Sequence, residues 1–393
     1  MSLASLVRPR EVARAVTPLE LLFDLVYIFA VSQLSINLIE HLDGRGIAQT
    51  LILTLAAMYA WFMTVWTSNW LDVERRPVQL MLLGLMFASL LMSTSIVGSF
   101  DEALTPWVKD RAGLFVIGYL AIQLGRTGFA VAAFRGHRLH DHFLNALAWE
   151  LGTAAIWVAG IFADGDARLA IWALAVTVTY GGVIAGHPLP GRRSPFSSDS
   201  QIYAEHLLER FRLFFLIALG ETVLTIGNAF ANVSIEFETL AALVAAFLGT
   251  VALWWCQFHR AERLGADAAL SAGDASRIVA VGNYALIAMV LGIVAIAVGD
   301  ELALADPSVN FGDGTTATIL VFGGPALFLL AQLGSLWHAT GAIQRPRALG
   351  CAALLLLAFA SAPFNTIVAV ACASAVLLTV AVADTLATPA TRE

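Results

Sequence analysis

The sequence predicts an all-α, polytopic membrane protein of about twelve transmembrane helices, and three features of the chain support this fold class. Hydrophobic residues make up 59% of the 393 residues and charged residues only 13%, whereas a soluble domain usually has about 25% charged residues. Such a chain cannot cover its surface with polar groups, so lipid must form part of its surroundings. The other two features are the spacing of long apolar stretches and the distribution of the basic residues between them.

The apolar stretches are long enough to cross a bilayer, which takes roughly 20 residues of helix for about 30 Å of hydrocarbon. Turn-forming pairs such as Asp43-Gly44 and Asp164-Gly165 separate several of them. Pro363 ends the eleventh stretch early. The predicted spans run approximately over 18–39, 47–68, 77–98, 112–134, 142–162, 167–187, 205–230, 236–258, 276–299, 317–341, 346–363 and 365–385.

The basic residues test this number, because the cytoplasmic segments of membrane proteins carry an excess of lysine and arginine. Alternating the spans across the membrane assigns four of the 22 basic residues to the side opposite the N-terminus. Three more lie within or at the edge of spans, which leaves fifteen on the N-terminal side. This asymmetry predicts that both termini are cytoplasmic. The basic residues on the side opposite the N-terminus are Arg45, Lys109, Arg111 and Arg168. Those within or at the edge of spans are Arg126, Arg210 and Arg212.

The chain also resembles itself, which predicts an internal duplication. Residues 23–34, FDLVYIFAVSQL, align with residues 211–222, FRLFFLIALGET, and the Gln-Leu-Gly of 123–125 aligns with that of 332–334. These matches occur in order and join equivalent spans. Since six spans is an even number, both halves enter the membrane in the same direction, and the repeats are expected to be parallel.

The domain organisation that follows is two six-helix repeats and a short tail. The first repeat covers 1–190, the second covers 200–388, and 389–393 form the C-terminal tail. In transporters built from repeats, binding sites form near the repeat interface. The first and seventh spans carry the repeated motif, so we expect them to line such a site.

Charged residues inside the spans are the candidates for function, because each costs roughly 2.5–3.5 kcal/mol at the bilayer centre. A substrate or ion pathway would explain them, and so would a structural network of ion pairs that fixes helix register. The candidate residues, including a histidine beside them in the seventh span, are Glu20, Asp24, Arg126, Glu150, His206, Glu209, Arg210, Arg212 and Glu221.

Their depth predicts which of these charges meet. At 1.5 Å per residue, Asp24 lies about 9 Å from the cytoplasmic end of its span, while Arg126 and Glu150 lie about 12 Å in and Arg212 slightly shallower. Two acids and two bases therefore share one layer, and we expect Arg126 to pair with Asp24 or Glu150. Glu221 lies past the midplane and is either a proton or cation site or a neutral, hydrogen-bonded carboxyl.

Other motifs carry weaker signals. His206-x-x-Glu209 and His259-x-x-Glu262 each place two metal-ligand types on one helix face, but helix ends are rich in both residues and no metal site is predicted. Gly323-Gly324-Pro325 is expected to kink the tenth span or break it. The ten tryptophans mostly fall near span ends, where aromatic belts form.

Two of the spans resemble a known family. Residues 17–30, TPLELLFDLVYIFA, closely resemble the opening motif of the bacterial low temperature requirement protein A (LtrA) family. Residues 206–214 and 218–222, HLLERFRLF and ALGET, are similar to that family's Glu-Arg and Leu-Gly-Glu signature, and 253–255, LWW, also fit. At 258–259 this chain has Phe-His where the family has an aromatic and an acid. The resemblance implies an integral membrane protein with a six-plus-six layout of helices.

The leading functional interpretation is a transporter or channel for a small solute or ion, with the candidate residues lining or supporting its path between the first and seventh spans. One alternative is an intramembrane enzyme acting on lipid, with His206, Glu209 and Glu221 as acid–base groups. The other is a non-catalytic membrane scaffold or stress-related protein. The absence of a nucleotide motif or an activated nucleophile favours a role other than catalysis.

The expected partners are the lipid bilayer and a small solute or ion. No basic patch suggests nucleic acid, the sequence identifies no cofactor, and it is compatible with a homo-oligomer. The expected location is the bacterial inner membrane, which the chain would cross many times.

Overall fold

The computed structural model describes residues 6–8, 15–101, 111–191, 202–271, 275–307 and 315–386. The predicted tail 389–393 and the basic residue Lys109 lie outside these ranges. The chain divides into two compact units. The first comprises Met1–Asn37 and Arg45–Arg210, and the second comprises Leu38–Gly44 and Phe211–Glu393.

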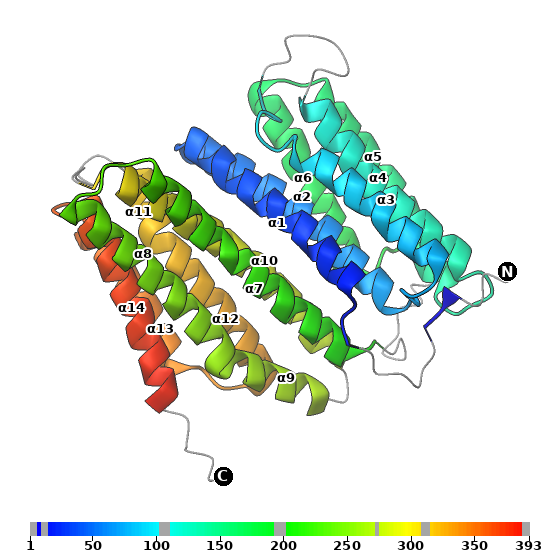
Figure 1. Ribbon diagram of the computed structural model, residues 1–393. Coiled ribbons are helices and arrows are strands. Elements are labelled where there is room, and N and C mark those ends of the chain that lie inside the picture. The colour runs from blue at the N-terminus through cyan, green and yellow to red at the C-terminus, as the bar shows by residue number, and fades with distance from the viewer. Residues whose placement is uncertain are drawn as a thin grey trace. The chain divides into compact units, whose positions relative to one another are not determined.

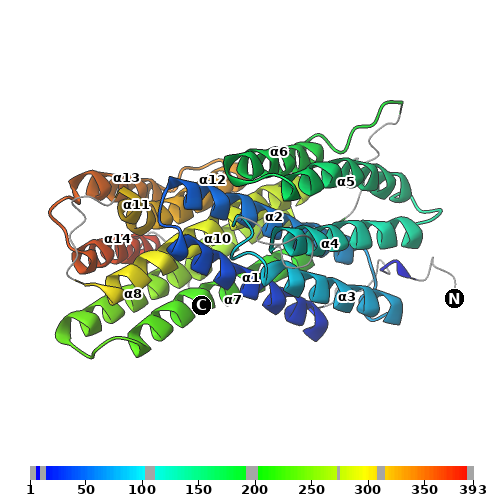
Figure 2. The same ribbon diagram turned by 90° about the horizontal axis from the view of Figure 1, so that it is seen from above.

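The helices of the first unit follow one another with short connections, apart from the longer segment 94–110 between α3 and α4 (Figure 1). Within the unit, α3 packs on α4, α4 on α5, and α5 on α6, and Figure 2 shows these helices side by side. This order is expected when short loops join consecutive antiparallel helices. The helices are α1 (Pro18–Glu40), α2 (Gly44–Asn69), α3 (Arg76–Ser93), α4 (Arg111–Ala133), α5 (His140–Ile161) and α6 (Gly165–Ile184).

The second unit is also built of helices, and two of its spans contain π-helical turns. Gln257–Ala261 joins α8 to α9, and Ile319–Gly323 joins α11 to α12. The second turn directly precedes Gly324 and Pro325, so the predicted distortion of the tenth span occurs there. The helices are α7 (Ala204–Ala231), whose residues up to Arg210 belong to the first unit, α8 (Phe237–Cys256), α9 (Glu262–Ser271), α10 (Ala275–Ala305), α11 (Thr315–Thr318), α12 (Gly324–Thr340), α13 (Arg345–Ala360) and α14 (Thr366–Leu386).

The predicted all-helical membrane fold is confirmed. Among the described residues, eleven helical segments are long and apolar enough to cross a membrane. The segment that corresponds to the predicted eleventh span is α13, which has 16 residues. It extends about 24 Å, which is less than the hydrocarbon thickness of about 30 Å. A twelfth crossing, the parallel repeat and the side of the termini remain predictions.

Apolar side chains face outward as well as inward, as lipid-exposed helices require. Leu80 on α3, Phe247 on α8 and Phe359 on α13 are all largely exposed. In water such side chains would lose the stabilisation that burial provides, whereas hydrocarbon solvates them. The outward face therefore agrees with the composition in assigning lipid as the surroundings of the spans.

The core of the first unit is aromatic. Trp157 and Trp172 are fully buried, with ring centroids 5.5 Å apart, and Tyr119 lies 4.8 Å from Trp157. Trp61 on α2 is fully buried too. The expectation that tryptophans form a surface belt is wrong for these three, because their indole rings fill the space between helices.

Helix α4 approaches α3 closely at a glycine. A methyl group on Gly118 would lie 2.7 Å from the backbone nitrogen of Met92 and 2.8 Å from the carbonyl oxygen of Ala88. These distances are shorter than van der Waals contact, and backbone atoms cannot move aside as a flexible side chain can. Glycine at this position thus sets the distance between the two helices.

Gly118→Ala is therefore expected to lower the free energy of unfolding by about 1–3 kcal/mol, measured by titration with sodium dodecyl sulfate. The matched control is Gly128→Ala on the same helix, where no neighbouring atom lies within 4 Å of the added methyl group. That change is expected to be neutral or to stabilise by up to about 1 kcal/mol. If the two substitutions changed the free energy of unfolding equally, α3 and α4 would not be in tight contact at Gly118.

Candidate functional site

The first cluster of buried charges joins the start of α7 to α1, within the first unit. The Arg210 guanidinium binds Asp24 through two nitrogens, with Nε–Oδ2 at 2.9 Å and Nη2–Oδ1 at 2.5 Å. Its third nitrogen, Nη1, donates to Glu20 Oε1 at 3.0 Å. Glu20 and Asp24 are four residues apart and therefore lie on one face of α1, so one arginine reaches both. We call Glu20, Asp24, His206 and Arg210 the α1–α7 cluster.

Every carboxylate oxygen of the α1–α7 cluster has a donor. Trp61 Nε1 donates to Asp24 Oδ1 at 2.8 Å, and the backbone nitrogen and hydroxyl of Thr17 donate to Glu20 Oε2 at 2.9 and 3.0 Å. His206 Nε2 lies 3.3 Å from Glu20 Oε1. The residues of the cluster are almost completely buried. A bidentate arginine–carboxylate pair with these additional donors is the geometry in which burial of charge is tolerated.

A second ion pair, Arg126 with Glu150, joins α4 to α5. Arg126 Nη2 donates to Glu150 Oε1 and also lies 3.1 Å from the hydroxyl of Thr127. The pairing of Arg126 predicted from depth is confirmed with Glu150, while Asp24 pairs with Arg210 instead. We call this buried pair of Arg126 and Glu150 the Arg126 layer.

The Arg126 layer is not fully satisfied. Arg126 is 0% exposed, yet its Nε and Nη1 have no hydrogen-bond partner among the described residues, and neither does Glu150 Oε2. Tyr59 and Tyr119 are buried close enough to interact with the charges of both residues. Leaving a buried donor or acceptor without a partner costs roughly 1–3 kcal/mol and more for a charged group. Water or a polar solute would offset that cost.

His187 lies in the turn after α6 and is oriented by an unusual backbone conformation. Its φ is +52°, a region that non-glycine residues adopt rarely, and it follows Gly186, whose φ is +73°. Burial, together with the positive charge of Arg126, lowers the pKa of His187 from 6.5 to about 4. The imidazole is therefore neutral at physiological pH, and it places a polar ring near the Arg126 layer.

Comparison with family models matches residues 15–382 to the bacterial low temperature requirement A protein (LtrA) family. The chain belongs to this family. The match includes the whole of α1 and α7, the helices that carry the α1–α7 cluster.

One relative of this LtrA protein is the uncharacterized protein RA0937 of Rhizobium meliloti (strain 1021). The two sequences are 34% identical over 326 residues, which cover 81% of this chain and 75% of the relative. No solved structure matches the chain.

Arg212 does not belong to the buried layer in which its depth placed it. Its side chain is 56% exposed and pairs with Glu262, with Nε–Oε1 at 3.2 Å, within the second unit. Two positions separate Arg212 from Arg210, which turns its side chain to a different side of α7. Depth along a helix therefore could not give the direction of the side chain.

The remaining predicted residues lie apart from these interactions. Glu209 is half-buried. Glu221, in the second unit, is buried and accepts a hydrogen bond from the Thr225 hydroxyl at 3.2 Å. It also lies near Glu301 of α10, close enough for the two charges to interact. Among the described residues, no three His, Cys, Asp or Glu side chains are grouped closely enough to hold a metal ion.

Four buried charges, Arg168, Arg347, Asp384 and Asp300, were missed because sequence reasoning assigned them to loops or to no role. Arg168 is fully buried and donates to the carbonyl oxygens of Ser99, Gly160, Ala163 and Asp101 at 2.9–3.2 Å. These carbonyl groups lie near the ends of other segments of the first unit, and Arg168 provides their hydrogen-bond donors. Charges at predicted span edges were treated as solvated, so the sequence offered no signal for this role.

The second unit has its own buried pair. Arg347 Nη1 lies 2.7 Å from Asp384 Oδ2, and its other nitrogens bind Gln332 Oε1 and the carbonyl oxygen of Cys256, each at 3.0 Å. This network ties α8, α12, α13 and α14 together. The fourth missed charge, Asp300, lies on α10 just beyond the predicted end of its span at 299.

Arg210→Ala is expected to lower the free energy of unfolding by about 3–5 kcal/mol, because two buried carboxylates would lose their positive partner. The control is Arg212→Ala on the same helix, whose exposed pair contributes at most about 1 kcal/mol. Titration of the purified variants with sodium dodecyl sulfate measures both. A loss of similar size in the two variants would contradict a stabilising role for the cluster.

His187→Asn is expected to flatten the dependence of the melting temperature on pH. Folding lowers the pKa of His187 from 6.5 to about 4. Between these pH values the unfolded chain binds a proton at this imidazole, whereas the folded protein does not. Stability is therefore lost as the pH falls from about 6.5 to about 4. Asparagine tolerates positive φ and does not titrate, so its variant should lose less over this window and match the wild type above it. If the melting temperatures of the wild type and His187→Asn changed equally with pH, the lowered pKa of His187 would be refuted.

Proposed function

We propose that this LtrA family protein is a transporter or channel for a small solute or ion, and that the Arg126 layer forms the polar part of its path. The proposal includes both termini on the cytoplasmic side, two parallel repeats and the bacterial inner membrane as the location. The distribution of basic residues and the internal sequence matches support these parts.

The observation that carries the proposal is the incomplete hydrogen bonding of Arg126. Two of its three guanidinium nitrogens and one oxygen of Glu150 have no partner among the described residues. The α1–α7 cluster, in the same unit, provides an internal comparison, because every one of its carboxylate oxygens has a donor. Buried charges that serve stability alone are expected to resemble the α1–α7 cluster. In the Arg126 layer, two donors of Arg126 and one acceptor of Glu150 are available to water or a solute.

Chemically, the layer suits a small polar or charged solute. Nε and Nη1 of Arg126 would donate to the oxygens of a solute or water, while Glu150 Oε2 would accept a hydrogen bond or attract a cation. The tyrosines beside it, Tyr59 and Tyr119, add hydroxyl groups. In this proposal the α1–α7 cluster supports the path by holding the start of α7 against α1.

A scaffold role is the second candidate, and the complete pairing of the α1–α7 cluster favours it. In that case water trapped in the Arg126 layer would satisfy the free atoms permanently. No contact among the residues that the structure describes favours the lipid-acting enzyme, because His206 is engaged by Glu20 through Nε2 and lies 3.5 Å from Asn69 Nδ2 through Nδ1.

Reconstitution into liposomes tests the proposal. Flux of protons and monovalent cations is measured for the wild type, Arg126→Lys, Glu150→Gln and Glu221→Gln, with Arg212→Gln as the control for an exposed charge. Arg126→Lys keeps the charge but loses the fork of donors, so we expect flux to fall at least about tenfold, as for a loss of about 1.4 kcal/mol.

The results separate the candidates. Flux in the wild type and the control, with loss in the Arg126 and Glu150 variants, would support the path. Flux that all variants retain would place the path elsewhere, and no flux for any ion tried, in vesicles shown to contain folded protein, would support the scaffold.

A further inference from the structure

A small cavity lies in the second unit where α8, α10, α14 and the junction of the π-helical turn with α12 meet. It offers about 10 Å³ to the centre of a water-sized particle, which is about the least space that holds one water molecule. Gly249, Asp300, Val321, Pro325 and Ser374 are among the residues that line it. The cavity therefore has room for a single particle the size of a water molecule or a small cation.

Asp300 is the charged group in this cavity. Its side chain is only 4% exposed, and its Oδ2 has no hydrogen-bond partner among the described residues. The other lining residues are apolar apart from Ser374. An isolated carboxylate in such surroundings is too costly to persist without a proton or a cation beside it. Unlike Asp24, Glu150 and Asp384, Asp300 is paired with no arginine in the part of the chain that the structure describes.

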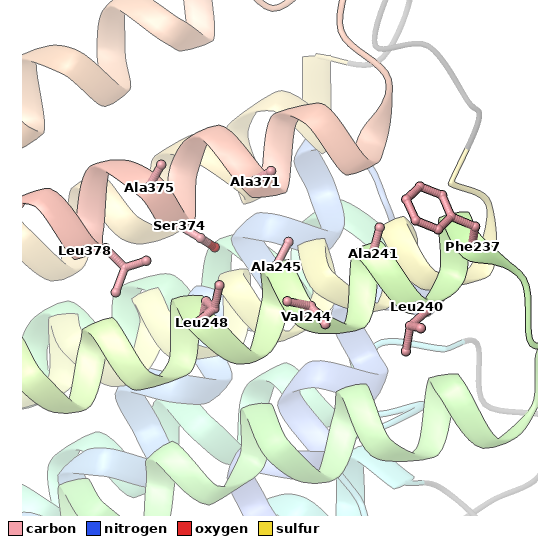
Figure 3. A pocket seen from close by; sticks show the side chains of 10 residues that line it. All are labelled: Phe237, Leu240, Ala241, Val244, Ala245, Leu248, Ala371, Ser374, Ala375 and Leu378. Carbon is pink, nitrogen blue, oxygen red and sulfur yellow. The ribbon is translucent and has the colours of Figure 1, made fainter.

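Ser374 supplies a second oxygen from the neighbouring helix. Its side chain lines both the Asp300 cavity and an apolar groove of about 410 Å³ between α8 and α14. Figure 3 shows Ser374 on α14 with its hydroxyl oxygen directed toward α8. A methyl group on Gly249 of α8 would lie 2.7 Å from that oxygen, so the glycine leaves room for the hydroxyl.

The backbone beside the cavity departs from regular α-helix. The π-helical turn Ile319–Gly323 ends next to Pro325, which has no N–H to donate to the carbonyl of Val321, four residues earlier. Val321 and Pro325 both line the cavity. Single π-helical turns inside α-helices occur frequently at functional sites, and unwound backbone in membrane proteins is tolerated where it faces protein or a polar cavity.

We propose that this cavity binds one monovalent alkali cation, with the carboxylate of Asp300 supplying the negative charge and the hydroxyl of Ser374 a neutral ligand. Carboxylate and hydroxyl oxygens are the donors that hard cations prefer. One carboxylate balances one positive charge, whereas a divalent ion would leave an uncompensated charge in an apolar cavity. The site contains no residue of the Arg126 layer. The cation-binding proposal is therefore tested independently of transport through that layer.

The test uses the purified full chain and sodium as the probe. The melting temperature is followed as sodium chloride replaces choline chloride at constant ionic strength, at neutral and at alkaline pH. A ligand that binds only the folded protein stabilises it in proportion to RT ln(1 + [L]/Kd). The melting temperature of the wild type is expected to rise steadily with sodium concentration, and binding of radiolabelled sodium to the protein should saturate.

Asp300→Asn should abolish the sodium response and the sodium binding while remaining folded, because asparagine has the same shape and removes the uncompensated charge. Ser374→Ala should weaken binding at least several-fold. The matched control is Glu301→Gln, which removes a half-buried charge at the next position of α10 and should keep the response.

Two results would overturn the proposal. One is a wild type that responds to pH but to no sodium concentration at either pH, which would mean that Asp300 only holds a proton. The other is a sodium response that Asp300→Asn retains, which would mean that the ion binds elsewhere.

Discussion

The structure depends on the cost of placing ionised side chains among apolar helices. The α1–α7 cluster meets this cost with one guanidinium that binds two carboxylates, and hydrogen bonds from Trp61 and Thr17 complete it. Because two members come from α1, two from α7 and the donor Trp61 from α2, the cluster fixes the register of three helices at once. In the second unit, Arg347 and Asp384 achieve the same result with different helices. Ion pairs in this protein therefore act as connectors between spans.

Two sites with incomplete pairing of buried charges are the candidates for function. In the Arg126 layer a buried guanidinium has unused donors, and in the Asp300 cavity a buried carboxylate has no cationic partner among the described residues. Arg168 donates to four carbonyl groups, yet its Nη2 has no hydrogen-bond partner among the described residues. The contrast that carries the proposal is therefore with the α1–α7 cluster of the same unit, in which every carboxylate oxygen has a donor.

Much of the fold followed from the sequence, because hydrophobic length and the positions of basic residues are one-dimensional properties. The helix boundaries predicted for α1, α7 and α14 agree with the structure within two residues. The candidate site followed only in part. Depth correctly predicted a partner for Arg126, yet it could not give the direction of a side chain around the helix, which is why Arg212 was placed in the interior. Asp300 was missed because α10 continues to Ala305, beyond its predicted end.

The central claim is that the Arg126 layer is hydrated or occupied by solute, while the α1–α7 cluster is dry. Hydroxyl-radical labelling with mass spectrometry tests it directly, because radicals generated from internal water modify adjacent aromatic rings. Tyr59 and Tyr119, which adjoin the layer, are expected to be labelled in the folded protein in spite of their burial, and Trp61, which binds Asp24, is expected to be protected. If Tyr59 and Tyr119 were as unreactive as Trp61, the layer would be dry and the account would be contradicted.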